Sequence, residues 1–593
     1  MRLRTVLAAL AACGGLVACP VRPAWAQSAV PVSKKGAYSP YEKESLAFAA
    51  ERLGTELDPT PDGKPIESID IVALEVIEKR DPAPGFLNAF HVTSRNYVIS
   101  REVLQKQGEP YVGVLADETA RNLRRLPQLS LVIVAPFKGH DPEHVRLVVI
   151  TKDVWSLRLS WDVAVGTGGL ERLVLQPTET NILGTQQTAA VRYQYLPLSF
   201  WLGARYVVPR ILGSRVSGVA EAHVIFNQKT GKSEGSYGGF RIERPLFSTQ
   251  TEWGVGGGVE WLNEVTRRYV NARLGSFDSK KTPGADLIPF SYRTDTLTSS
   301  NYVTRSFGWA KKVDVTLGLN VSKAQYSTGD LSAYDPVAVA DFKDTRVPTS
   351  DTRVAPYFQA RVYTTNFLRV LDFETLALQE DFRLGHDVWF RVYPVTTALG
   401  STRNFWGFFG AAQYSVPMGD GLARLGVESV TEAEPTRVAD ASVSVNARLV
   451  SPRTRAGRLV LDSSTISRYR NYLRSTTFLG GAGRLRGYPS NFFAGKDATV
   501  TNLEFRSRPL EIFSCQVAAV AFLDAGGAFD GWSARTAHFG TGGGVRVLLP
   551  QLDRSVFRID LGVPIGPNVP AGIPPVSFSA TFDQAFGVAT VGP

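Results

Sequence analysis

The sequence contains little cysteine and no long apolar run beyond its first residues. Its 593 residues include three cysteines, of which Cys13 and Cys19 fall within the first 26 and leave Cys515 alone in the rest. One cysteine forms no internal disulfide, which excludes a disulfide-stabilised secreted scaffold. After residue 26 no stretch approaches the ~18 apolar residues that a membrane helix requires. Such a chain could cross a membrane only as a closed barrel, because lipid offers unpaired backbone groups no partners.

Signals of catalysis are also scarce. The six histidines are scattered, no H-E-x-x-H or G-x-S-x-G motif is present, and GVGGGVE and GTGGGVR lie inside strand patterns rather than between a strand and a helix. His140 and His144 have the spacing of metal ligands, but Asp141 and Pro142 between them indicate a hairpin turn. We therefore predict a protein that is not an enzyme and that carries no cofactor and no metal.

The charge is basic but dispersed. Lysine and arginine number 65 against 55 acidic residues, a formal net charge of +10. No basic cluster of roughly 5 to 8 residues appears, so a solvated basic surface is a better interpretation than a nucleic-acid site. No nucleic-acid partner is expected.

The first 26 residues have the pattern of a secretory signal peptide. Two arginines precede an apolar core, which ends on Ala24-Trp25-Ala26. The protein is therefore expected to be exported. The tetrapeptide LVAC, which ends at Cys19, resembles a lipoprotein signal, so lipidation of Cys19 stays open as an alternative.

Residues 27–64 are rich in proline, serine, glycine and charge, and we predict a linker with one short helix. Ser39 is a suitable N-cap, Pro40 suits the first helical position and Gly54 ends the helix. For residues 39–54, a loosely docked helix and a plug or regulatory helix both remain open.

Residues 65–157 are predicted to form a small α+β domain. IESIDIVALEV, SLVIVAPF and HVRLVVITKDVW have strand patterns. One helix is expected from near Ser100 to Gly108, and a second, capped by Asp117, is expected to end at Pro127. This β-α-α-β-β order, with REVLQKQGEPY and RNLRRLPQLSLVIV, resembles the polypeptide-transport-associated (POTRA) domain in a single copy. The resemblance implies a periplasmic domain that engages unfolded polypeptides, partly through a sheet edge.

Residues 158–593 carry strand patterns and no convincing amphipathic helix. In KVDVTLGLNVSK the valines and leucines face one way and the polar residues the other, and TEWGVGGGVEW and SVFRIDLGV alternate likewise. Sheets that exposed such apolar faces to water would aggregate, whereas a barrel turns them to lipid around a polar lumen. We predict a mainly β fold with a transmembrane antiparallel β-barrel, and ~27 residues per strand with its loops gives roughly sixteen strands.

Two carboxylates are expected inside this barrel. TNLEFRSRP places Glu504 opposite its leucine and phenylalanine, and AFLDAGG places Asp524 opposite its leucine. If the leucine side meets lipid, both carboxylates point into the lumen, where they need a cation.

Two short motifs indicate which cation this is. LRGY, from Leu485, and FLDAG, from Phe522, match the [VIL]-R-G-[FY] loop motif and the F-x-D-x-G strand motif of the BamA/TamA-like outer-membrane assembly superfamily, also called the bacterial surface antigen family. The chain resembles this family from about residue 66 to 586. In the family the sixth outer loop folds back into the barrel and its arginine pairs with the strand aspartate. The resemblance therefore implies a loop-to-barrel pin and a strand motif made of Arg486, Gly487, Tyr488, Glu504, Asp524, Phe522 and Gly526.

The last strand pattern, VSFSATFDQAF, has aromatic residues at even spacing. It resembles a C-terminal sorting signal with Phe582 and Phe586 as its aromatics. Residues 587–593 follow it, which departs from the usual pattern.

The resemblance implies the outer membrane of a Gram-negative-type bacterium, with the POTRA-like domain in the periplasm. Its implied partners are unfolded outer-membrane or secreted polypeptides, outer-membrane lipid and periplasmic accessory proteins. The expected function is insertion or translocation of polypeptides. A two-partner-secretion-like dedicated translocator, a lipid-handling barrel and a passive channel remain alternatives.

Overall fold

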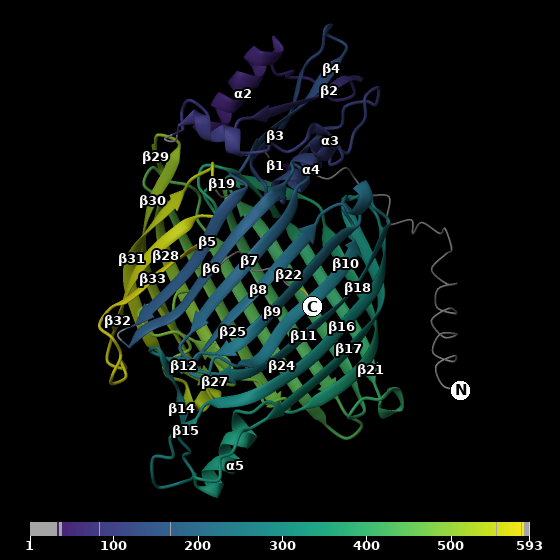
Figure 1. Ribbon diagram of the computed structural model, residues 1–593. Coiled ribbons are helices and arrows are strands. Elements are labelled where there is room, and N and C mark those ends of the chain that lie inside the picture. Colours follow the sequence, from purple (N-terminus) through teal and green to yellow (C-terminus); the bar gives the residue numbers. More distant parts are fainter. Residues whose placement is uncertain are drawn as a thin grey trace.

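The computed structural model describes residues 33–34, 38–81, 84–166, 168–552, 554–582, 584–585 and 592. The predicted signal peptide, the alternative lipid site at Cys19 and the predicted signal residue Phe586 lie outside these residues. The described chain forms a closed barrel with a small α+β domain over one end, called here the domain end (Figure 1). The opposite end is called the far end.

The barrel strands run antiparallel to their neighbours all the way round. Their bounds are β5 Leu157–Gly166, β6 Gly169–Ile182, β7 Gln187–Leu196, β8 Ser199–Val208, β9 Ser217–Asn227, β10 Ser233–Arg244, β11 Trp253–Arg267, β16 Ser291–Phe307, β17 Lys311–Ser327, β18 Asp351–Thr364, β21 Gly385–Val395, β22 Phe405–Met418, β23 Gly421–Ala433, β24 Val438–Val450, β25 Gly457–Asn471, β28 Asp497–Ser507, β29 Leu510–Ile512, β30 Cys515–Phe529, β31 His538–Leu548, β32 Phe557–Ile565 and β33 Ser577–Phe582.

In the described residues β28 and β29 both pair with β30 and form one interrupted strand, so the barrel has twenty strands. The prediction of sixteen was wrong. It assumed long connections, but many are tight turns: only residues 197–198 separate β7 from β8, and residues 419–420 separate β22 from β23. Short connections leave more of the chain for strands.

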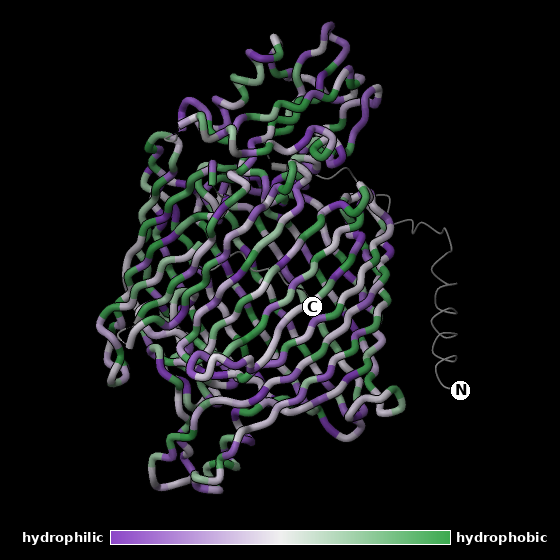
Figure 2. The backbone as a smooth tube through the Cα atoms, viewed as in Figure 1, coloured by the Kyte–Doolittle hydropathy of each residue, from purple (hydrophilic) through white to green (hydrophobic). Residues whose placement is uncertain are grey.

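Side chains alternate across the barrel wall. Exposed apolar residues on the outside include Leu297, Val303, Phe358, Val388 and Phe390, while the residues between them turn inward. Figure 2 shows the resulting change of hydropathy from residue to residue along the strands. An apolar outside around a polar inside is what a lipid-facing barrel requires.

The barrel closes at a short seam. The last strand, β33, pairs with the first, β5, over three residue pairs, from Phe578↔Val165 to Ala580↔Val163. By contrast, β16 and β17 pair along almost their whole length, from Arg293↔Ser327 to Phe307↔Val313. Few ladder hydrogen bonds therefore hold the seam.

The α+β domain has a three-stranded sheet in the order β2-β4-β3, with β2 (Ile66–Leu74) parallel to β4 (Val145–Asp153) and β3 (Leu129–Lys138) antiparallel to it. Its helices are the 3-10 helix η2 (Gly85–Phe90), α3 (Asn96–Ser100) and α4 (Gly113–Arg124). A core of aliphatic side chains from the sheet packs against α4.

Both helix predictions in this domain were wrong in their bounds. The first helix ends at Ser100 instead of starting there, and the following turns carry Glu102, whose carboxylate binds Arg210 and Arg215 of the barrel. The second begins at Gly113, and Asp117, the predicted cap, instead pairs with Arg369. Contacts with the barrel thus override the local sequence signals.

The predicted helix after the leader is confirmed as α2 (Pro40–Leu53). Ser39 Oγ accepts the N–H of Glu42, the Glu42 carboxylate accepts the N–H of Ser39, and Gly54 ends the helix with a left-handed φ of 63°. The helix packs outside the lumen against the sheet of the α+β domain (Figure 1). In this structure α2 therefore does not lie in the lumen as a plug.

A buried hairpin lies between this domain and the barrel. It comprises β19 (Phe367–Leu371) and β20 (Gln379–Arg383), in the connection from β18 to β21, and β1 (Ser33–Lys34) pairs with it in parallel. Residues 365–384 are called here the mouth hairpin. Every residue of β19 is buried.

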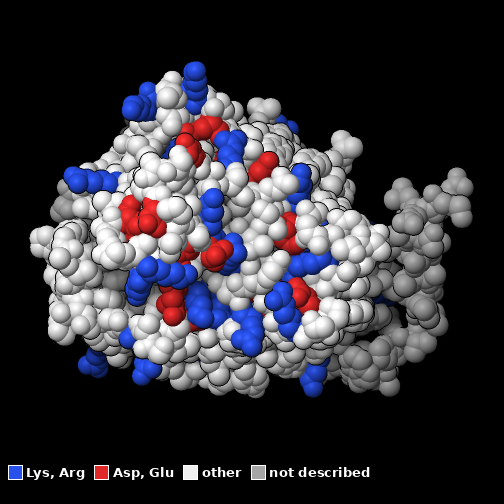
Figure 3. All heavy atoms as spheres, turned by 90° about the horizontal axis from the view of Figure 1, so that it is seen from below, with Lys and Arg blue, Asp and Glu red and all other residues white. Residues whose placement is uncertain are grey.

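The far end carries the small hairpin strands β12 (Tyr269–Val270), β13 (Arg273–Leu274), β14 (Ser276–Phe277) and β15 (Ile288–Pro289) and the helix α5 (Pro336–Thr345) (Figure 1). The prediction that no helix follows the α+β domain was therefore wrong, because α5 lies at Pro336–Thr345. Asp335 caps α5 through its carboxylate and proline occupies the first turn, a local signal that the strand patterns obscured. None of the described helices is long and apolar enough to cross a membrane. Seen from this end, basic and acidic residues are intermixed (Figure 3).

Candidate functional site

The connection between β25 and β28, residues 472–496, folds into the barrel and is called here the lumen loop. It contains the short strands β26 (Thr477–Leu479) and β27 (Phe493–Gly495). At its tip Leu485, Arg486 and Tyr488 are at most 2% exposed. The loop that the sequence predicted to enter the lumen is thus enclosed by protein.

Glycines allow the loop to lie directly on the barrel wall. Gly487 has a φ of 103°, and a Cβ there would lie 2.8 Å from the backbone carbon of Val563. A Cβ at Gly562 would lie 2.5 Å from the nitrogen of Gly487, and one at Gly540 would lie 2.0 Å from the oxygen of Arg486. No side chain fits between loop and wall at these points, so the glycines of β31 and β32 make the contact possible.

Arg486 binds both predicted carboxylates. Its Nε lies 2.9 Å from Asp524 Oδ2 and its Nη2 lies 2.8 Å from Asp524 Oδ1, and its backbone N–H also donates to Oδ2 at 2.9 Å. Its Nη1 donates to Glu504 Oε1. The guanidinium carbon lies 3.6 Å from the centre of the Phe522 ring. The planar fork, the two acids and the aromatic face together define one position for this arginine.

Neither acid is exposed to solvent at all, and Arg486 is 2% exposed. Removing these charges from water is costly, so the net stability from the whole group is modest, whereas removing one partner leaves a buried charge uncompensated. The arrangement therefore fixes the place of the loop more than it stabilises the fold.

More charged residues surround this group than the sequence predicted. Arg506 and Arg546 approach Glu504, and Arg546 and Arg558 bind Asp560 at 2.6 and 3.0 Å. Asp560 and Arg558 share the polar face of the alternating segment SVFRIDLGV. This alternation could have predicted that both charges face the lumen. Asn502 donates to Asp524 at 2.7 Å.

The remaining predicted loop and strand residues anchor the loop beside the seam. The N–H of Gly487 donates to Ser577 Oγ at 3.0 Å, and the Tyr488 hydroxyl donates to the Phe539 carbonyl at 3.0 Å. On the other side of the seam, Glu171 of β6 accepts the N–H of Ser490 at 3.4 Å. Gly526 allows close approach as well, since a Cβ there would lie 2.6 Å from the Thr499 oxygen.

Phe582, the described residue of the predicted sorting signal, lies at the domain end of the seam. Its ring centre is 5.4 Å from that of Phe557 and 6.3 Å from that of Trp161. These rings border a cavity of ≈ 550 Å³ that is lined largely by apolar side chains, including Trp155 and Leu159. The short pairing of β33 with β5 thus adjoins an apolar pocket.

The mouth hairpin joins the α+β domain to the barrel through buried charges, which sequence reasoning missed. Arg369 of β19 lies 3.1 Å from Asp117 of α4 and 3.2 Å from Asp381 of β20. Arg124 of α4 binds Asp381 and donates to Gln379 at 2.7 Å. Only the spatial meeting of segments some 250 positions apart reveals this group.

The hairpin also contains Glu380, a carboxyl group whose pKa is raised by its surroundings. Burial and the neighbouring Glu374 raise the pKa of Glu380 to about 8, although the backbone N–H groups of Phe373 and Glu374 favour its charged form. Burial likewise raises the pKa of Glu42, whose carboxylate accepts the N–H of Gln379 at 3.1 Å. These carboxyl groups lie where α2 meets the hairpin.

One arginine connects the hairpin to the buried charges of the lumen loop. Arg506 Nε donates to Glu504 Oε2 at 2.8 Å, and its Nη1 donates to the Phe373 carbonyl at 2.6 Å. Glu504 in turn binds Arg486. The lumen loop and the mouth hairpin, which enter from opposite ends, therefore meet through Arg506.

In the described residues the only grouping with ligand atoms of several metal-binding side chains close together is His140, Asp141 and His144, within 4.8 Å of one another. It lies in the turn between β3 and β4, where the sequence predicted a hairpin turn; His140 is exposed, and Asp141 and His144 are partly buried.

No family model matches the sequence, and no curated protein matches it. Solved structures with similarity include CdiB from Escherichia coli, at 12% identity and a TM-score of 0.40, covering 96% of this chain and 93% of that one. BamA from Haemophilus ducreyi lacking POTRA domains 1-3 is 11% identical with a TM-score of 0.35, and covers 93% of this chain and 95% of that one. CdiB from Acinetobacter baumannii is 9% identical with a TM-score of 0.36, covering 91% and 81%.

Proposed function

We propose that this protein is an outer-membrane barrel that inserts or translocates polypeptides, which the α+β domain receives in the periplasm. The observation that carries the proposal is the pairing of Arg486 with Asp524, which holds the lumen loop beside the three-pair seam. LRGY and FLDAG, the motifs on which the family resemblance depends, supply both partners.

The α+β domain has a suitable edge for extended polypeptide. In the sheet order β2-β4-β3, β2 is an edge strand, and in the described chain no further strand pairs with it. An extended segment can add to such an edge through main-chain hydrogen bonds, which accept many sequences. This supports a role as a POTRA-like receptor for unfolded chains.

The seam supports lateral passage. Three residue pairs have few hydrogen bonds to break, and the lumen loop touches both sides of the seam through Ser577 and Glu171. Loop and seam can therefore open together, with no covalent chemistry and no nucleotide.

Depletion of the protein followed by quantitative proteomics of the outer membrane tests the proposal. Broad loss of barrel proteins supports insertion, and loss of one exported protein supports a dedicated translocator of the two-partner-secretion type. Unchanged polypeptides with altered lipid composition would favour lipid handling, and no change in either would favour a passive channel; both results contradict the proposal. Complementation with Arg486→Ala beside wild type tests the pin in the same assay.

A further inference from the structure

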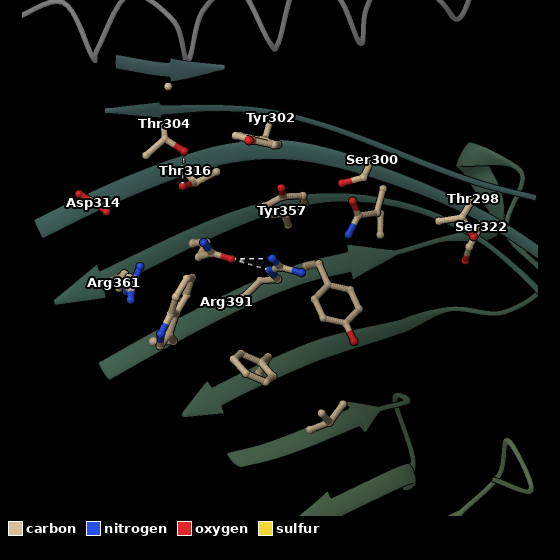
Figure 4. Close-up of a pocket in the computed structure, with 18 of the residues that line it drawn as sticks. Thr298, Ser300, Tyr302, Thr304, Asp314, Thr316, Ser322, Tyr357, Arg361 and Arg391 are labelled. Atoms are coloured by element: carbon tan, nitrogen blue, oxygen red, sulfur yellow. Dashed lines mark hydrogen bonds between the residues drawn. The ribbon is translucent and has the colours of Figure 1, made fainter. Parts of the chain in front are cut away.

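A large chamber lies in the lumen against the part of the barrel wall opposite β32, about half of the strands away from it. It has a volume of ≈ 860 Å³ and is lined by inward-facing residues of β16, β17, β18 and β21 (Figure 4). The lumen loop and its buried charges play no part in it.

One cation of the chamber lacks an internal counter-ion. Arg391 donates from Nε and Nη2 to the single oxygen Gln359 Oε1, at 2.9 and 2.6 Å, and no carboxylate of the described residues lies within ion-pair distance of it. Arg361, in the same wall, is bidentate to Asp387 at 2.8 and 2.6 Å. Figure 4 shows Arg391 in the middle of the chamber with its two bonds to the amide. Its Nη1 edge has no hydrogen-bond partner in the described chain, so it remains able to bind an anion.

Aromatic rings and hydroxyl groups surround this cation. The Arg391 guanidinium carbon lies 4.4 Å from the centre of the Tyr357 ring, which limits the positions open to it. Tyr302, Tyr393 and Trp389 add further ring surface, and several of the other lining side chains carry hydroxyl or amide groups, among them Thr298, Ser300, Thr316, Asn320 and Ser322. Such a wall can hydrogen-bond a ligand backbone while Arg391 binds its charge.

One described residue of this chain, Gly592, lies at the edge of the chamber. The N–H of Gly592 donates to Glu428 Oε1 at 3.0 Å, and a Cβ at Gly592 would lie 3.4 Å from the Trp389 ring. The backbone of Gly592 thus packs beside the Trp389 indole at this edge of the chamber. This contact favours a polypeptide over a carbohydrate as the occupant.

We propose that this chamber binds acidic segments of the polypeptide cargo, with Arg391 taking an aspartate or glutamate carboxylate and the surrounding tyrosines and hydroxyl groups contacting the neighbouring chain. The inference rests on the proposed transport of polypeptides and adds a preference for cargo charge. Gln359 is a positioning residue, since it fixes the guanidinium through Nε and Nη2 and leaves Nη1 for the ligand.

The test uses the full chain in detergent micelles and a dye-labelled peptide of alternating glycine and glutamate, with a glycine and glutamine peptide of equal length beside it. Fluorescence anisotropy should show affinity for the acidic peptide about tenfold higher, as expected for hydrogen bonds to a charged group, and a decrease with added salt. Arg391→Ala should remove that advantage, whereas Arg437→Ala, in an exposed turn, should retain it.

A second variant avoids deleting the arginine. Gln359→Glu places a carboxylate beside Arg391 and should lower the affinity for the acidic peptide about as much, by supplying an internal counter-ion. Equal affinity for both peptides, or an advantage that survives both substitutions, would overturn the inference. So would Arg391-dependent binding of an oligogalacturonate of matched charge without binding of the peptide.

The experiments distinguish a wrong inference about cargo binding in the chamber from a wrong proposal of polypeptide transport. If depletion leaves all outer-membrane and secreted polypeptides unchanged but the peptide still binds through Arg391, the chamber is an anion site and cargo binding is wrong. If depletion removes polypeptides but the peptides bind equally, only the charge preference is wrong.

Discussion

Arg486 and Asp524 share three hydrogen bonds, one from the backbone and two from the guanidinium of the arginine, within a region closed to solvent. Docking of the lumen loop and pairing of Arg486 with Asp524 are therefore coupled, because the guanidinium reaches the carboxylate only when the loop backbone lies on β30 to β32.

Loss of either partner should therefore free the loop. Arg486→Ala leaves Asp524 buried without its cation while Glu504 keeps Arg506, and Asp524→Ala leaves the cation short of one acid, each destabilising by about 3–5 kcal/mol. Urea unfolding in micelles measures the change, and trypsin cleavage in residues 472–496 reports loop release. The double variant should cost less than the sum of the two, because both remove one interaction.

Arg484→Ala is the matched control for this pair. Arg484 lies two residues away in the same loop and binds Asp462, but its side chain is 26% exposed. Its replacement should cost clearly less than that of Arg486. Equal costs for both arginines, or additive costs in the double variant, would contradict the special position of Arg486.

Glycine at position 487 should be required for loop docking. Gly487→Ala meets the wall at 2.8 Å and forces a φ of 103° on alanine, which costs about 1–3 kcal/mol from backbone strain alone. Gly483→Ala is the control, because its Cβ would find no atom nearer than 4.0 Å. Thermal melting and trypsin cleavage should separate the two variants; identical behaviour would mean that the loop does not rest on β32.

The mouth hairpin should dock less firmly as the pH rises. Glu380 has a pKa of about 8 in the folded protein against roughly 4.3 in an unfolded chain. Between these values the folded protein retains a proton that the unfolded chain has released, so stability falls with rising pH across this window and levels off above it. Glu380→Gln should flatten this part of the melting-temperature profile between pH 5 and 9.

The control for the pH profile is Glu51→Gln, on the exposed side of α2. It should leave the slope unchanged. A Glu380→Gln profile as steep as that of the wild type would show that another group titrates.

The sequence predicted those parts of the molecule that depend on local pattern. Alternation in segments such as KVDVTLGLNVSK gives the two faces of the barrel wall, and Ser39, Pro40 and Gly54 give α2. It could not give the number of strands, because that depends on how short the connections are. It also could not give the mouth hairpin: LRVLDFETLALQEDF has the composition of an ordinary strand pair, and its burial depends on α4, α2 and the barrel meeting around it.

The candidate site shows the same division. The motifs LRGY and FLDAG predicted Arg486 and Asp524, the alternation of TNLEFRSRP predicted Glu504, and the structure brings all three together. Arg506 alternates with Glu504 on the same face of its strand, yet its bond to the Phe373 carbonyl depends on a hairpin from the other end of the barrel. No local pattern encodes a contact between two such distant segments.

A reversible lock on the seam tests the central claim most directly. Ala164 and Ser579 are paired across β5 and β33, so cysteines at both positions, with Cys515→Ser to remove the native thiol, can form a cross-strand disulfide. The control pair replaces Asn446 and Ser464, which face each other across β24 and β25, away from both the seam and the Arg391 chamber. If cargo passes through the seam, the oxidised 164–579 lock abolishes recovery of the polypeptides lost on depletion, reductant restores it, and the control lock has no effect. Full recovery with the 164–579 lock closed would contradict lateral passage.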